Sequence, residues 1–200
     1  MKKSFKVMLA VAMLFSATLS ANAQFSKKGN SSVPDRFHMG VRGGITVNTY
    51  TGDYDVKSFL FPTGGLAVDF QVAPVPVFVG IGLNYVNYGC EIEGRYGRYS
   101  YSETIDDQHS IQIPITASYH INVAPNLFVN PFIGSFMAYN FNDDFEQFNY
   151  GLRLGCGMNF GRLTFDLGYD FGLANLGVSG YDAKSGTFFM TFGYNWAGSK

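Results

Sequence analysis

The chain has 200 residues, and its 14 Lys and Arg nearly balance its 15 Asp and Glu. Charged residues make up only 14% of it, whereas aromatic residues reach 17% and Gly contributes 24 residues. Soluble domains usually carry about 25% charged residues. This composition excludes a disordered chain, a coiled coil and a strongly basic nucleic-acid-binding protein, and it argues against an ordinary cytosolic enzyme.

The first 23 residues have the three regions of an export signal. Three Lys residues make the start basic, residues 7–19 are apolar, and Ala21-Asn22-Ala23 fits the small-x-small cleavage pattern. The apolar run is shorter than the ~20 residues that a membrane-spanning helix needs. We therefore expect cleavage before Gln24, export to the cell outer membrane, and a short periplasmic segment at residues 24–35.

Beyond residue 36 apolar and polar residues alternate with a period of two, which predicts strands with one apolar and one polar face. The fifth segment carries apolar residues at both odd and even positions, so its phase stays open. The segments are long for a soluble sheet, whose strands have about five or six residues, and they suit tilted membrane strands of about 9–11. The eight predicted strands cover residues 37–48, 65–72, 77–85, 111–121, 127–139, 148–160, 163–172 and 187–196.

The connections between these strands alternate strictly between short and long. Short links follow the second, fourth and sixth strands, and long links follow the first, third, fifth and seventh, at about 49–60, 89–108, 140–147 and 174–186. Outer-membrane barrels show this pattern of tight periplasmic turns and larger outer loops. The sequence thus predicts an all-β, eight-stranded antiparallel up-and-down transmembrane β-barrel over residues 36–196, with both termini periplasmic and a tail at 197–200.

Closing the sheet leaves no unpaired edge in the bilayer, and the apolar faces then meet lipid. Aromatic side chains should gather at both lipid–water boundaries, where their polar tips stay hydrated. The candidates for these boundary positions are Tyr85, Tyr119, Tyr150, Tyr169, Phe171, Tyr194 and Trp196.

Five charged residues fall on the polar faces, which a barrel turns inward. They are Arg42, Asp69, Arg153, Asp166 and Asp170. An isolated charge in a narrow lumen is costly, so we expect these side chains to pair across strands and plug it. The alternative is a water-filled channel lined by separate charges.

Three segments resemble strands of the PorT-like outer-membrane β-barrel family. They are residues 111–115 (IQIPI), 149–157 (NYGLRLGCG) and 169–176 (YDFGLANL). The likeness covers nearly all of the mature chain and implies a small barrel, similar to OmpA and OmpX, with no catalytic residues to carry over. The chain departs from the family in having Pro131-Phe132 in place of Pro-Tyr. A few members serve in protein secretion, a role that we do not transfer.

The residues for catalysis or metal binding are sparse. Ser110, His109 and Asp106 or Asp107 contain the residue types of a hydrolase triad, but neighbouring residues in a strand point to opposite faces, so His109 could not readily activate Ser110. Cys90 and Cys156 should lie too far apart to form a disulfide. No spacing typical of a metal or nucleotide site occurs. We therefore expect no catalytic residue, cofactor or metal.

The long links are acidic, which we interpret mainly as solvation. The link at 89–108 also contains a cluster of Tyr and Arg residues, which are favoured at protein contacts. These contact candidates are Arg95, Tyr96, Arg98, Tyr99 and Tyr101. The expected partners are outer-membrane lipid, lipopolysaccharide, the outer-membrane assembly machinery and a protein bound through the outer loops.

Two other interpretations of the pattern remain open. A soluble periplasmic barrel of the lipocalin type would show the same alternation with its apolar faces turned inward, around an apolar ligand. A barrel enzyme acting on lipid or peptide is a further alternative. Periodicity alone does not decide between them, and a non-enzymatic outer-membrane barrel with a structural or surface-binding role fits the strand lengths and links best.

Overall fold

The computed structural model describes residues 36–52, 56–57, 59–72, 74–96, 99–105, 108–141, 147–175 and 183–197. All of them belong to one compact unit, Ser32–Lys200. The predicted signal peptide, the segment at 24–35 and most of the predicted tail lie outside the described residues. No helix in the described part of the chain is long and apolar enough to cross a bilayer.

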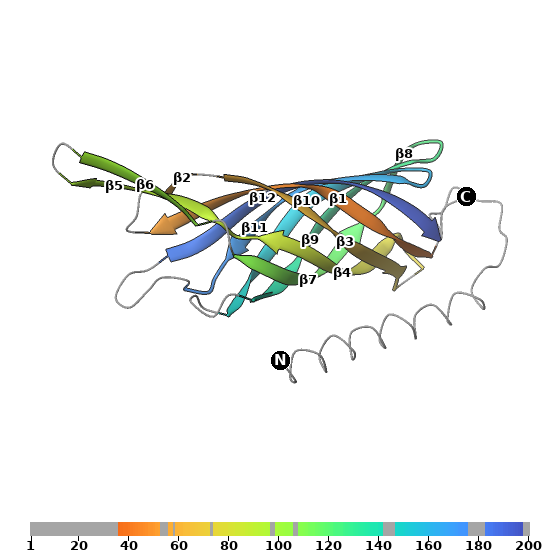
Figure 1. Cartoon of the computed structure of the whole chain (residues 1–200). Coiled ribbons are helices and arrows are strands. Elements are labelled where there is room, and N and C mark those ends of the chain that lie inside the picture. The colour runs from red at the N-terminus through yellow and green to blue at the C-terminus, as the bar shows by residue number, and fades with distance from the viewer. Residues whose placement is uncertain are drawn as a thin grey trace. The chain divides into compact units, whose positions relative to one another are not determined.

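Eight long strands form a closed antiparallel barrel, which confirms the predicted fold class (Figure 1). Each strand pairs with its neighbour along the chain, and the last pairs with the first from Gly52↔Ala183 to Met39↔Ala197, which closes the sheet. The strands are β1 (Phe37–Gly52), β3 (Phe59–Gln71), β4 (Val77–Asn87), β7 (His109–Tyr119), β9 (Leu127–Asn140), β10 (Phe148–Phe160), β11 (Leu163–Gly172) and β12 (Ala183–Ala197).

Tight turns connect the strands at one end, which we call the turn end. The short strand β8 (Ile121–Ala124) continues β7 beyond His120 and pairs with the start of β9. Asn126 and Gly161, in the turns before β9 and β11, have positive φ values of 63° and 57°. Asn and Gly tolerate this left-handed backbone best, which explains why these residues stand where the chain reverses.

Apolar side chains cover the outside of the barrel. Val41 and Leu167 are 43% and 38% exposed, although both lie in the middle of long strands. In β9, whose phase the sequence left open, Ile133 points outward with 62% exposure, whereas Phe136 points inward with 1%. The soluble alternative, with apolar side chains gathered inside, is therefore wrong.

Aromatic side chains lie near both ends of this apolar surface. Tyr85 and Tyr150 are exposed towards the end with the long links, which we call the loop end, and Tyr119 and Trp196 towards the turn end. Rings at these two levels match the boundary positions that a membrane barrel favours.

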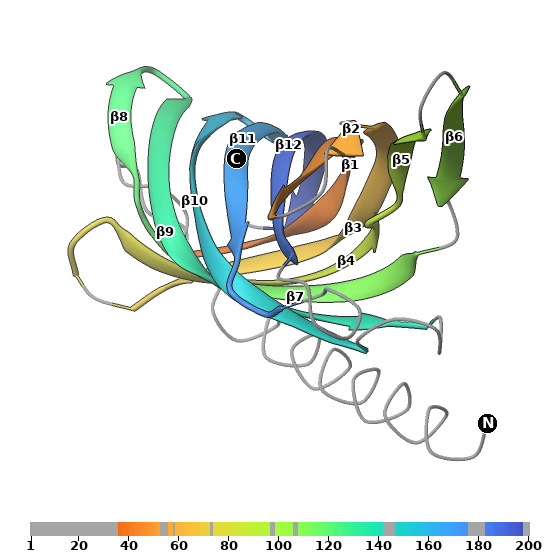
Figure 2. The ribbon, with the colours of Figure 1, turned by 90° about the vertical axis from the view of Figure 1, so that its left-hand side faces the viewer.

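The link between β4 and β7 is a hairpin, where the sequence indicated only a long loop. It contains β5 (Cys90–Tyr96) and β6 (Tyr99–Ile105), and β2 (Val56–Lys57) from the first long link pairs with β5. This three-stranded sheet extends past the barrel at the loop end (Figures 1 and 2). The alternating Tyr and Ser of β6 explain the strand, since hydroxyl-bearing and aromatic residues suit a pleated surface.

Candidate functional site: the barrel lumen

All five inward charges of the sequence lie in the lumen, and the structure divides them between two clusters. Arg153 and Asp170 form the first, near the loop end, and Arg42, Asp166 and Asp69 form the second, nearer the turn end. Strand geometry places them there, because every second side chain of a strand points into the lumen and the apolar neighbours point outward.

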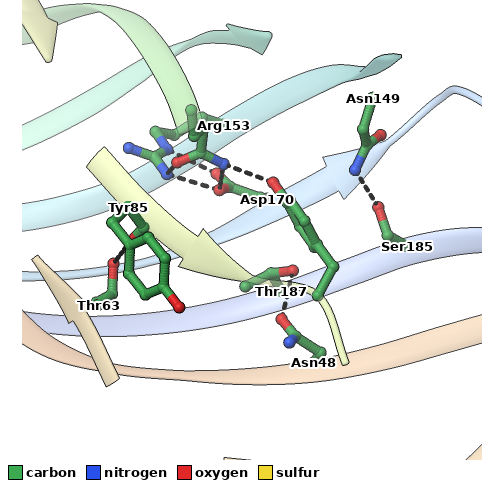
Figure 3. A network of polar contacts seen from close by, with 10 residues as sticks. Asn48, Thr63, Tyr85, Asn149, Arg153, Asp170, Ser185 and Thr187 are labelled. Atoms are coloured by element: carbon green, nitrogen blue, oxygen red, sulfur yellow. Dashed lines mark hydrogen bonds and ion pairs between the residues drawn. The ribbon is translucent and has the colours of Figure 1, made fainter. Parts of the chain in front are cut away.

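Arg153 and Asp170 are register partners on β10 and β11, and their side chains pair twice. Arg153 Nε donates to Asp170 Oδ1 at 2.6 Å, and Arg153 Nη2 donates to Asp170 Oδ2 at 2.6 Å (Figure 3). Gln112 of β7 bridges them, since its Oε1 accepts from Arg153 at 2.7 Å and its Nε2 donates to Asp170 at 2.9 Å. The Arg153 guanidinium also lies 4.3 Å from the centre of the Phe189 ring. This cluster leaves both charges paired and links β7, β10 and β11 within the lumen.

Arg42 of β1 is the centre of the second cluster. Its Nε donates to Asp166 Oδ2 of β11 at 3.2 Å, and its Nη1 donates to Asn195 Oδ1 of β12 at 3.0 Å. Asp69 of β3 is further away, with 4.0 Å between its Oδ2 and Arg42 Nη2. The Arg42 guanidinium thus pairs with two carboxylates, and its interaction with Asp69 is the weaker of the two.

Polar side chains fill the lumen at the loop end. Tyr88, in the connection after β4, is fully buried and its hydroxyl accepts from Gln112 at 3.0 Å. Burial, followed by the nearby Asp170 carboxylate, raises the pKa of Tyr88, so its phenol stays neutral. Further pairs close the same level: Thr187 donates to Asn48 at 3.0 Å and Asn149 donates to Ser185 at 2.9 Å (Figure 3).

Three stacked rings close the turn end. Phe78 and His120 lie nearly parallel, with 3.9 Å between their centres, and His38 lies 5.5 Å from Phe78. All three side chains are at most 5% exposed. The inward side chain of His38 on β1 and that of His120, directly after β7, thus meet around Phe78 of β4.

Sequence reasoning found the lumen charges but missed their neutral partners. Gln112, Asn195 and Tyr88 satisfy the charges, yet only Gln112 and Asn195 lie at inward positions that the alternation marks. Tyr88 comes from a link, and nothing in its local sequence shows that the chain folds back into the lumen there.

The weak hydrolase constellation does not assemble. Ser110 is buried inside and donates to Asn140, whereas the His109 ring lies outside, with Nδ1 2.6 Å from the Tyr85 hydroxyl. Asp106 and Asp107 lie outside the described residues. Cys156 is a free, exposed thiol on the outer face of β10.

The contact candidates of the longest link lie on its hairpin. Arg95 and Tyr96 belong to β5 and Tyr99 and Tyr101 to β6, whereas Arg98 lies outside the described residues. The backbone register pairs Tyr96 with Tyr99 and Gly94 with Tyr101, so the three tyrosines lie close together along the hairpin.

Comparison with known proteins agrees with this architecture. A family model described as "Outer membrane protein beta-barrel domain" matches residues 22–177. The chain belongs to this family. It is thus an integral outer-membrane barrel protein, and no match to a curated protein was found.

Several solved outer-membrane proteins are similar in fold. Neisserial surface protein A (NspA) is 11% identical with a TM-score of 0.45, over 84% of this chain and all of that one. Escherichia coli outer membrane protein W is 16% identical with a TM-score of 0.44, over 83% and 100%. Ail, the attachment invasion locus protein of Yersinia pestis, is 13% identical with a TM-score of 0.41, over 80% and 98%.

Proposed function

We propose that this protein is a non-enzymatic outer-membrane barrel that is closed to solutes and acts at the cell surface through its outer hairpin. The observation that carries the proposal is the lumen closed at both ends: the loop end is closed by Tyr88, its amide neighbours and the Arg153–Asp170 pair, and the turn end by the stacked rings around Phe78. Eight strands leave an interior just wide enough for such side chains.

The same proposal includes the way in which the chain reaches the membrane. We take residues 1–23 as a cleaved signal peptide, and we take the assembly machinery, lipid and lipopolysaccharide as the barrel's partners in the outer membrane. The resemblance to the PorT-like family supports a small barrel of this kind.

Conductance in planar bilayers tests the closure. The wild-type protein should give no stable pores, because side chains close both the loop end and the turn end of its lumen. A variant that combines Tyr88→Ala, Arg153→Ala and Asp170→Ala with Phe78→Ala opens both ends and should conduct. The matched control is Cys156→Ser, whose side chain faces lipid and which should remain silent. Large stable pores from the wild-type protein would contradict the closure.

The surface role depends on the β5–β6 hairpin, whose strand β6 contains Tyr99 and Tyr101. A photo-crosslinking residue placed at Tyr101 in intact cells should give a defined protein adduct that is absent at Val123, an exposed residue of β8 at the turn end. Equal adducts at both positions would show that the hairpin has no special part in binding.

A further inference from the structure

The five lumen charges do not balance, because three carboxylates face two guanidinium groups. Arg153 is fully engaged by Asp170, with two contacts of 2.6 Å. Arg42 is shared, at 3.2 Å from Asp166 and 4.0 Å from Asp69. Asp69 is therefore the carboxylate that lacks a full counter-charge. A buried charge without a counter-charge is costly, so the lumen needs one positive charge that its side chains do not supply.

Asp69 faces open space in the lumen. Its side chain is 26% exposed, and it lines a partly open cavity of about 120 Å³ in the lumen. The cavity is large enough for several water molecules, since one needs roughly 10–15 Å³ by this measure. All five charged residues of the two clusters line it, and its uncharged polar lining includes Thr116, Ser118, His120 and Asn130.

Two of these side chains are buried with one polar atom that lacks a hydrogen-bond partner among the described residues, and this observation is independent of the charge balance. Asn130 and His120 are each 5% exposed, and no described residue forms a hydrogen bond with Asn130 Oδ1 or His120 Nδ1. His120 Nε2 lies 3.2 Å from Ser118 Oγ. If Nε2 donates its proton there, Nδ1 carries a lone pair. Two buried acceptors thus line the same cavity as the under-paired carboxylate.

We propose that this cavity binds one alkali-metal cation beside Asp69, with Asn130 Oδ1 as a second oxygen ligand and with part of the ion's water shell retained. Carboxylate and amide oxygens are hard ligands that suit such ions. A single positive charge restores neutrality, whereas a divalent ion would leave the lumen with an excess of positive charge.

Unfolding by urea in detergent micelles tests the ion. The urea midpoint should rise with sodium or potassium chloride and saturate, relative to choline chloride at the same ionic strength, because the methyl groups of choline keep oxygen ligands away from its charged nitrogen. Asp69→Asn should remove this difference. Glu103→Gln removes the same charge from β6 of the outer sheet and should keep it. A ligand that binds only the folded state stabilises it in this saturating way.

The position of the ion can be measured separately. In crystals grown with rubidium chloride, anomalous scattering should place one ion in the lumen near Asp69 and Asn130, and Asp69→Asn should abolish that peak. Equal midpoints in sodium and choline, or an unchanged sodium effect in Asp69→Asn, would overturn the proposal. The absence of an anomalous peak in the lumen would also overturn the proposal, as would the binding of a proton by Asp69 in place of the cation.

Discussion

Arg153 illustrates how single residues hold this barrel closed. Its guanidinium contacts Asp170, Gln112 and the Phe189 ring, which come from three other strands. Arg is suited to this position because its planar group forms two parallel hydrogen bonds with one carboxylate. The contacts with Gln112 and Phe189 extend this pair of neighbouring strands to β7 and β12.

Asp170→Asn should destabilise the protein strongly, because it leaves the Arg153 charge buried and unpaired. Breaking a buried pair in this way costs about 3–5 kcal/mol. The double variant Arg153→Met, Asp170→Asn should lose less than the two single variants together, since no charge remains uncompensated. Urea unfolding in lipid vesicles measures the unfolding free energies of both single variants and of the double variant. Strictly additive losses would show that the two side chains do not stabilise each other.

At the scale of the strands, two neighbouring glycines show that the inner face of the barrel is crowded and the outer face is open. Gly43 and Gly44 are neighbours on β1. A methyl group at Gly44 would collide with the backbone carbonyl of Met190 on β12, whereas none of the described atoms lies within 4 Å of a methyl group at Gly43. The close approach of β1 and β12 at this point therefore requires glycine only on the lumen side.

Gly44→Ala should accordingly lower the unfolding free energy by about 1–3 kcal/mol, the usual cost of overpacking. Gly43→Ala is the matched control and should change it by less than about 0.5 kcal/mol, as surface substitutions usually do. Heat-modifiable migration on gels and urea titration would compare the two variants. A greater loss from Gly43→Ala than from Gly44→Ala would contradict the assignment of the faces.

The strands also show how far the sequence can be interpreted. Alternation predicted the barrel, its strand number and the inward position of all five charges, because a period of two follows directly from strand geometry. In β9 it failed, since Phe132 and Phe136 point inward where the pattern would place polar residues. A wide aromatic ring fills the lumen as well as it faces lipid. The link after β4 was beyond prediction, because Tyr88 is buried by contacts with distant strands.

The whole molecule is organised as a polar, cross-linked interior inside an apolar surface, the reverse of a soluble barrel. These outward apolar side chains are stabilised by contact with lipid, since removal of apolar area from water is the dominant favourable term. This inversion explains why the interior carries the charges and why the exposed surface carries Ile, Leu and Phe. Both proposals, the closed lumen and the bound cation, depend on it.

Depth-dependent fluorescence quenching by brominated lipids tests this inversion most directly. Trp196 is the single Trp of the chain and lies near the turn end of β12. Lipids brominated near the head groups should quench it best. In a Trp196→Phe background, Leu154→Trp places the probe in the middle of β10, where the native side chain is 45% exposed, and bromines near the acyl-chain ends should quench it best. A Leu154→Trp probe that no brominated lipid quenches would contradict the account.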